Sequence, residues 1–252
     1  MSVRLDTDGP LATISIDRPN AKNAFNQAMW LQLVELLRQA GANDRLRLLV
    51  LRSSEPGSAF SAGADIKELL ANKDDAGWRS ANQAAINRAQ YELTRFARPT
   101  LAFIEGDCVG GGCGIALACD LRLAAPAARF AITPAKLGLV YPLHDVKLLT
   151  DLIGPGQAKR LLFTGELIGA EEALRIGLVE AIGDDSALFA EPILAASPHS
   201  TAAMKRFVRR VLDGQAEDDE DTLRTFAEAF TAPDFAEGTA AFIAKRPPRF
   251  GA

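Results

Sequence analysis

The sequence has few residues of the kinds that form disulfides or bind metal ions. Its 252 residues include three cysteines and two histidines. The cysteines, Cys108, Cys113 and Cys119, are odd in number and have no histidine nearby, so their spacing does not match a zinc site. We therefore expect small, buried, free thiols in a cytoplasmic protein, and we expect no metal site.

Charge of one sign and long apolar runs are also lacking. The formal net charge is -4, which indicates no surface for nucleic acid or for an anionic membrane. No stretch approaches the ~20 apolar residues that cross a bilayer, and residues 1–6 have no apolar core of a signal peptide. We therefore expect neither a nucleic-acid partner nor a membrane partner.

The residues that are present predict a globular α/β chain with a helical tail. At 48% hydrophobic and 24% charged residues, the chain can bury one sizeable core. Apolar patterns predict strands at 11–17, 46–51, 100–104 and 121–124, alternating with helices at 27–41, from 65 onward and at 78–96. Later segments are almost entirely helical, at 144–153, 156–163, 170–176, 201–213, 218–231 and 234–245. This order predicts an α/β core followed by a smaller α-helical region.

Two glycine-containing turns are the candidate site. Three glycines at 110–112 separate the strand at 100–104 from a helix-like stretch, which places bare backbone N–H groups at a helix N-terminus. Such groups can hold a developing negative charge. Close packing alone would also explain the glycines, but a dinucleotide fingerprint is excluded because Ile115 stands where its last glycine is needed. The second turn, at 60–65, enters a helix that Asp65 could cap, with Glu68 completing a capping box.

The two turns together resemble the signature stretches of the crotonase (enoyl-CoA hydratase/isomerase) superfamily. They lie at 61–66 and 110–113, some fifty residues apart. Weaker matches extend the resemblance over nearly the whole chain, at 18–19, 23–24, 98–100, 119–120, 137–138, 162–165, 173–179 and 242–247. Each match is weak alone, but their order makes the resemblance specific.

The resemblance implies a fold, a substrate class and an assembly. Residues 1–195 would form a spiral core of ββα turns, and residues 196–252 a helical region for oligomerisation and coenzyme A closure. The protein would act on an acyl-coenzyme A thioester as a homotrimer or a hexamer of paired trimers, with coenzyme A entering as part of the substrate and no separate cofactor. The backbone N–H groups of Ala64 and Gly111 would form an oxyanion hole for the thioester oxygen.

The same resemblance implies a set of residues that contact coenzyme A or the acyl group. Lys245 and its neighbour Arg246 would approach coenzyme A from another subunit, although a solvated surface residue is the commoner fate of a lysine. The full set comprises Lys22, Ala24, Ala62, Asp65, Ile66, Gly110, Phe242 and Lys245.

The sequence departs from the superfamily's hydratases at both catalytic glutamates. Gly114 stands where the first glutamate is expected, and Thr133-Pro134 stands in place of the Pro-Glu pair that carries the second. Addition of water to a double bond needs a positioned proton acceptor and donor, worth about 10²–10⁴ in rate. The residues therefore argue against the default hydration reaction.

Residues 133–141 resemble the branch that contains methylmalonyl-CoA decarboxylase. Thr133 and Tyr141 match that branch's spacing, and the resemblance implies catalytic roles for both, although the branch keeps a glutamate where Gly114 stands and a histidine where Ala64 stands. Loss of CO₂ needs no base, and a pocket poor in carboxylates would not repel the substrate's own charge. The first hypothesis is therefore a decarboxylase-like lyase that passes through a thioester enolate.

Two other hypotheses stay open. One is an enoyl-CoA hydratase or isomerase that takes its acid or base from His144, Asp145 or Glu105. The other is a member that binds acyl-CoA without turnover. His144 and Asp145 are adjacent, so on a helix they point about 100° apart and form no dyad. Thr133 could also be a simple helix cap, and Tyr141 a half-buried aromatic residue.

Overall fold

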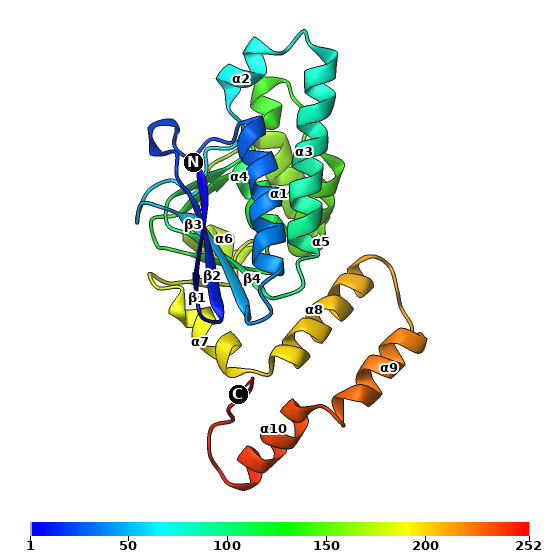
Figure 1. Cartoon of the computed structure of the whole chain (residues 1–252). Coiled ribbons are helices and arrows are strands. Elements are labelled where there is room, and N and C mark those ends of the chain that lie inside the picture. The colour runs from blue at the N-terminus through cyan, green and yellow to red at the C-terminus, as the bar shows by residue number, and fades with distance from the viewer. Residues whose placement is uncertain (1, 252) are drawn as a thin grey trace.

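The computed structural model describes residues 2–251, in which a six-stranded sheet carries the other elements (Figure 1). The strand order is β1-β2-β3-β4-β6-β9, and every pairing is parallel except that of β1 with β2. The strands are β1 (Val3–Asp8), β2 (Leu11–Ile16), β3 (Leu48–Ser53), β4 (Thr100–Ile104), β6 (Leu121–Ala124) and β9 (Ala181–Ile182). A smaller sheet contains β5 (Asp107–Val109), β7 (Arg129–Ala131) and β8 (Ile168–Gly169).

The burial of the strands follows from their composition. Strand β4 is buried along its whole length and β3 along all but one residue, as expected for apolar runs inside a parallel sheet. Strand β2 alternates between more and less buried positions, which matches its alternating sequence. The three cysteines are free and buried.

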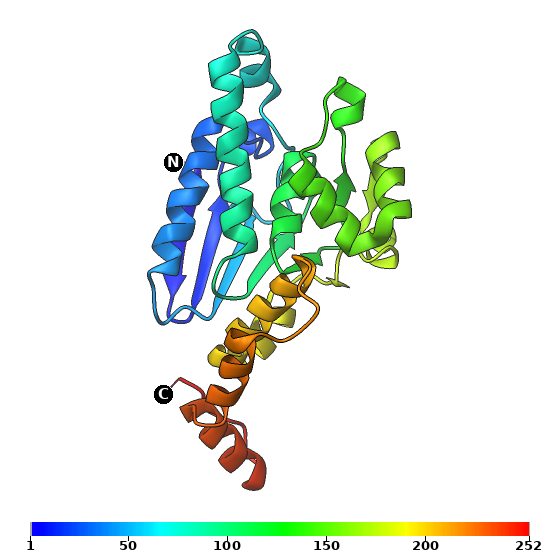
Figure 2. The same cartoon turned by 90° about the vertical axis from the view of Figure 1, so that its right-hand side faces the viewer.

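Helices cover this sheet and then continue beyond it. Helix α4 is buried on nearly all sides, and α1 packs beside α3 (Figures 1 and 2). The helices are α1 (Gln27–Gly41), α2 (Ile66–Ala71), α3 (Ala76–Thr94), α4 (Gly111–Ala118), α5 (Leu143–Thr164), α6 (Ala170–Arg175), α7 (Ala187–Ala195), α8 (Pro198–Leu212), α9 (Glu220–Ala229) and α10 (Pro233–Ile243). Two short 3₁₀ helices occur at Pro19–Ala21 (η1) and Pro134–Leu137 (η2).

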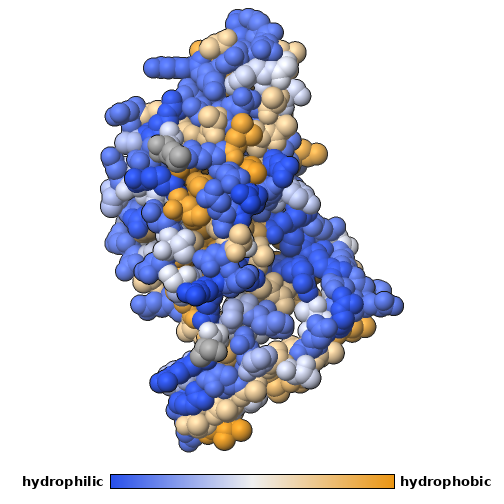
Figure 3. All heavy atoms as spheres, viewed as in Figure 1, coloured by the Kyte–Doolittle hydropathy of each residue, from blue (hydrophilic) through white to orange (hydrophobic). Residues whose placement is uncertain are grey.

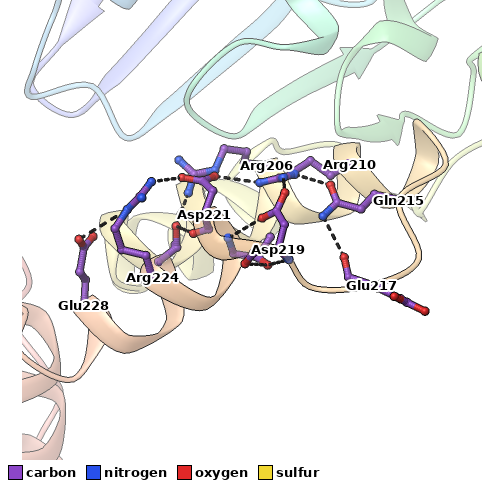
Figure 4. Close-up of polar contacts among 10 residues, drawn as sticks. Arg206, Arg210, Gln215, Glu217, Asp219, Asp221, Arg224 and Glu228 are labelled. Carbon is purple, nitrogen blue, oxygen red and sulfur yellow. Dashed lines mark hydrogen bonds and ion pairs between the residues drawn. The ribbon is translucent and has the colours of Figure 1, made fainter.

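The last three helices project from the sheet as an arm (Figure 1). Helices α8 and α9 are joined by ion pairs and hydrogen bonds, including Arg210 to Asp221 at 2.8 Å and Arg206 to Thr225 at 2.7 Å (Figure 4). Several large apolar side chains of the arm are exposed, among them Phe226, Phe230 and Phe242. Apolar atoms gather at the lower end of the molecule, where α10 lies (Figure 3).

The predicted α/β class is confirmed, with several local differences. Strands β1, β5, β7, β8 and β9 and helix α7 were not predicted, and most of these strands have only two or three residues, too few for a periodic pattern. The helices predicted at 144–153 and 156–163 form α5, which is interrupted at Gly154 (φ 74°). Of the expected capping box at 65–68, the Asp65 cap is confirmed and the Glu68 contact is wrong. Asp65 does cap α2, but the Glu68 carboxylate accepts from the Gln27 N–H at 2.9 Å.

The division of the chain at residue 195 stays a prediction.

Within residues 2–251, no helix is long and apolar enough to cross a membrane. In the same range, no three metal-ligating side chains of histidine, cysteine, aspartate or glutamate gather at one point.

An ion pair between a buried arginine and a more exposed glutamate joins β6 to the segment before β9. The Arg122 side chain is almost fully buried, pairs with Glu180 and donates to the carbonyl oxygens of Cys119 at 2.9 Å and Leu178 at 3.0 Å. We expect Glu180→Ala to lower the free energy of unfolding by about 3 kcal/mol, because it leaves a buried guanidinium without its counter-charge. Urea denaturation measures this, with the exposed Glu191→Gln as the control; equal stability of the two variants would contradict the expectation.

Candidate functional site

The site is built where three segments run side by side. Residues 22–25 pair with residues 62–65, since the Ala62 N–H donates to the Lys22 carbonyl at 2.9 Å and the Phe25 N–H to the Gly63 carbonyl at 2.7 Å. The Asn23 side chain holds the first segment by donating to the Ala59 carbonyl at 2.7 Å. These contacts place Lys22, Ala24 and Ala62, all predicted from the resemblance, at one locus.

The third segment leads from β5 into α4. The Val109 N–H donates to the Ser61 carbonyl at 2.8 Å, so β5 lies alongside the second segment. Gly63 has a φ of +96°, and a Cβ atom on it would lie 2.8 Å from the Val109 carbonyl oxygen and 3.2 Å from the Gly111 nitrogen. Only glycine fits this crossing.

The crossing brings two free backbone donors together. A Cβ atom on Gly111 would lie 3.7 Å from the Ala64 nitrogen, so the two peptide N–H groups are neighbours. Among residues 2–251, neither N–H donates to a protein acceptor. Gly111 is the first residue of α4, where a helix has free donors and the positive end of its dipole. The pair can therefore stabilise an oxygen on which negative charge develops.

Tyr141 contacts the carbonyl end of the peptide unit between Gly110 and Gly111, opposite the N–H of Gly111. Its hydroxyl donates to the Gly110 carbonyl oxygen at 3.0 Å. Burial raises the pKa of the phenol well above its usual value, and the nearby Asp145 carboxylate raises it further. The phenol therefore stays protonated. The catalytic role that the resemblance implies for Tyr141 stays a prediction, and its hydroxyl proton is engaged by the main chain.

Thr133 lies beside the same turn. A Cβ atom on Gly110 would lie 3.7 Å from the Thr133 hydroxyl oxygen. Thr133 occupies the N-cap position of η2, but its side chain makes no capping hydrogen bond. The alternative that Thr133 is a simple helix cap is therefore wrong. Its hydroxyl lies near the glycine turn at 110–112.

The space beside Gly114 is filled by polar side chains from two other helices. A Cβ atom on Gly114 would clash with Gln90 Nε2 and lie 3.0 Å from Asp145 Oδ2. Gln90 comes from α3 and Asp145 from the first turn of α5, and each is only 1% exposed. The surroundings of Gly114 therefore contain a carboxylate although position 114 itself has none. The carboxylate of Asp145, from a different part of the chain, lies beside the position that a Cβ atom of residue 114 would take.

These side chains carry buried polar atoms without partners. They are Gln90 Nε2, Gln90 Oε1, Asp145 Oδ1 and His144 Nδ1, with the last two 3.6 Å apart. A buried polar atom left unpaired costs about 1–3 kcal/mol, so such a group usually marks a place for water or for a ligand. The third acid/base candidate, Glu105, lies elsewhere and pairs with Arg52 at 2.7 Å.

Asp65 braces the site. Burial alone would raise the pKa of its carboxyl, but hydrogen bonds from Arg18 and from the N–H groups of α2 outweigh burial and lower it. Its carboxylate accepts from Arg18 at 2.7 Å, and the partly exposed Ile66 follows it in the chain. This favours a structural role for Asp65.

The C-terminal members of the predicted site lie far from the oxyanion pair of their own chain. Phe242 is 85% exposed on α10, and Lys245 follows that helix. Helix α10 lies at the end of the arm, away from α2 and α4 in both views (Figures 1 and 2). A contact of these residues with coenzyme A would therefore require a second subunit, as the resemblance implies.

Gln90 was not predicted as a site residue. Its sequence position gave a signal, because Gln90 lies on the same helical face as the buried Leu93 and Thr94, three and four residues further on. An amide among such positions needs a partner inside the protein or in a ligand.

Comparisons with known proteins show which family the chain resembles over its whole length. The family model described as "Enoyl-CoA hydratase/isomerase" matches residues 6–252. A short-chain-enoyl-CoA hydratase of Clostridium acetobutylicum is 32% identical over 97% of this chain and 95% of its own. A crotonyl-CoA hydratase of Syntrophomonas wolfei is 30% identical over 99% and 97%.

A solved structure extends the agreement to the whole fold. An enoyl-CoA hydratase/carnithine racemase from Magnetospirillum magneticum superposes with a TM-score of 0.93 at 31% identity, covering 100% of this chain and 96% of its own. The crotonase-type fold expected from the sequence is thereby confirmed. The chain belongs to the enoyl-CoA hydratase/isomerase family.

Proposed function

We propose that the protein hydrates the double bond of a 2-enoyl-coenzyme A thioester, with water held between Asp145 and Gln90. The observation that carries the proposal is the buried Asp145 carboxylate at the bare Cα of Gly114. It supplies, from α5, a proton acceptor that the sequence lacks at position 114. This is the second of the three hypotheses from the sequence, with Asp145 as the acid/base residue.

The position of the carboxylate favours a water molecule over direct contact with substrate. A glutamate at 114 would carry its carboxylate two carbons beyond its Cβ, whereas the Asp145 carboxylate lies beside the Cβ position itself. The difference leaves room on the substrate side for a small polar molecule. Water needs two to four polar partners, and the unpaired amide atoms of Gln90 together with Asp145 Oδ2 beside Gly114 can provide them.

The reaction then follows from the two halves of the site. The carboxylate of Asp145 takes a proton from the water while the oxygen of the water bonds to C3 of the acyl group. The π electrons of the double bond move to the thioester oxygen. The N–H groups of Ala64 and Gly111 stabilise that oxyanion. Asp145 then returns the proton to C2 and the thioester carbonyl re-forms. Gln90 orients the water and carries no charge.

Two observations weigh against the decarboxylase hypothesis. The relatives described above are named hydratases. In addition, a buried carboxylate beside the acyl group would repel a malonyl carboxylate in a medium of low dielectric constant. The decarboxylase branch therefore stays an untested prediction with less support.

A substrate panel tests the proposal. Purified protein is given crotonyl-CoA, a 3-enoyl-CoA and methylmalonyl-CoA. We expect the absorbance of the conjugated enoyl thioester to disappear as 3-hydroxybutyryl-CoA forms. Release of CO₂ from methylmalonyl-CoA without hydration would establish the decarboxylase instead, and tight coenzyme A binding without any product would establish a non-catalytic member.

We also propose that copies of the chain associate through the arm. Phe226, Phe230 and Phe235 form an edge-to-face row with ring centroids 5.4 Å apart, yet each is exposed in the single chain. A row of exposed aromatic side chains is typical of a surface that another copy covers, and the resemblance implies a trimer.

We expect Phe226→Asp to lower the mass measured by light scattering, while the exposed Glu217→Gln leaves it unchanged. A monomeric wild-type protein would contradict the proposal.

A further inference from the structure

The peptide unit between Gly110 and Gly111 is held at its carbonyl end. The Gly110 carbonyl oxygen accepts from the Tyr141 hydroxyl at 3.0 Å and from the Gly114 N–H at 3.1 Å. The N–H of this same peptide unit is the Gly111 donor of the oxyanion pair. A group that binds one end of the unit therefore acts on the other end.

We propose that Tyr141 is a positioning residue that strengthens and orients the Gly111 donor. A hydrogen bond to a peptide carbonyl polarises the unit, which strengthens its N–H as a donor by roughly 10–30% per bond. It also fixes the plane of the peptide. The turn needs such support, because Gly110 has no side chain and adopts φ 52° and ψ -115°.

The surroundings of Tyr141 suit this role. The side chain is 7% exposed, so water does not compete for the Gly110 carbonyl. Because burial raises the pKa of the Tyr141 phenol, the hydroxyl keeps the proton with which it donates to the Gly110 carbonyl. Tyr141 also precedes α5, the helix that carries Asp145, so the oxyanion pair and the proton carrier are connected through one short segment.

An enolate analogue tests the inference without any turnover. Acetoacetyl-CoA loses a proton between its two carbonyl groups, and the enolate has an ultraviolet band of its own. We expect Tyr141→Phe to weaken binding of this enolate about tenfold, the effect of one net hydrogen bond. Binding of the saturated butyryl-CoA, whose carbonyl carries little charge, should change less than twofold.

The chain offers a matched control in its other tyrosine. Tyr91 is 54% exposed and stacks against Arg95, so Tyr91→Phe should leave both affinities unchanged. Equal losses for the enolate and for butyryl-CoA in Tyr141→Phe would indicate support of the fold alone and overturn the inference. Unchanged enolate binding would overturn it as well.

The inference rests on the oxyanion pair and not on the proposed hydration. If crotonyl-CoA is not hydrated but Tyr141→Phe still weakens enolate binding selectively, the proposed function fails and the role of Tyr141 stands. If hydration proceeds and the selective loss is absent, the proposed function stands and the role of Tyr141 fails.

Discussion

Asp145→Asn is expected to lower kcat for hydration of crotonyl-CoA by about 10²–10⁴-fold, the range for removal of a general acid/base. The amide has nearly the same shape as the carboxylate, so the packing around Gly114 should persist. It can still bind water but cannot take its proton. Steady-state kinetics on crotonyl-CoA measure the change, and KM should change far less than kcat, because the substrate is held by other residues.

The control for this variant removes an aspartate of no assigned role. Asp184 is exposed, so Asp184→Asn should retain wild-type kcat. Gln90→Leu should give an intermediate loss, since it removes one partner of the water and leaves the base. A wild-type kcat in Asp145→Asn would show that the proton passes elsewhere and would remove the basis of the proposed function.

The glycine turn at 110–112 could be picked out from sequence because its signal is local, whereas the pairing of Ala64 with Gly111 came from the family resemblance. Each donor lies in a turn whose glycines the backbone requires, and a φ of +96° at Gly63 or +52° at Gly110 is a property that a sequence displays as glycine. The alternation of strands and helices is local as well. The fold class therefore followed from the sequence, which also led to the proposal that the turn at 110–112 holds negative charge.

The acid/base could not be predicted in the same way. Gly114, Gln90 and Asp145 come from three different helices, and their meeting depends on how α3, α4 and α5 pack. From sequence, position 114 is only the absence of a carboxylate. The adjacency of residues 144 and 145 in the chain does not reveal which side chains Asp145 meets across the helix interface.

The coenzyme A contacts predicted for the arm came from the family resemblance and not from the physics of the chain. Phe242 and Lys245 match a family pattern, but in the single chain Phe242 is exposed on α10, and a contact with coenzyme A would need a second subunit. A resemblance can name such residues, whereas the physics of a single sequence cannot bring them to the site.

The second large effect is expected at the crossing of the two glycine turns. Gly63→Ala should reduce kcat by about 10²–10³-fold, the loss found when one oxyanion donor is removed. The new Cβ atom would lie 2.8 Å from the Val109 carbonyl oxygen and 3.2 Å from the Gly111 nitrogen, so the turn that carries Ala64 must move away from α4. The φ of +96° adds strain of about 1–3 kcal/mol.

Gly57→Ala separates the two effects of this substitution. Gly57 also has a left-handed φ, +73°, but a Cβ atom on it would meet nothing within 4 Å. It should therefore lower the midpoint of urea unfolding and leave kcat nearly unchanged, whereas Gly63→Ala should lower both. If the two variants lost activity equally, backbone strain and not the separation of the donors would be responsible. If Gly63→Ala kept full activity, the paired N–H groups of Ala64 and Gly111 would not be the groups that stabilise the enolate.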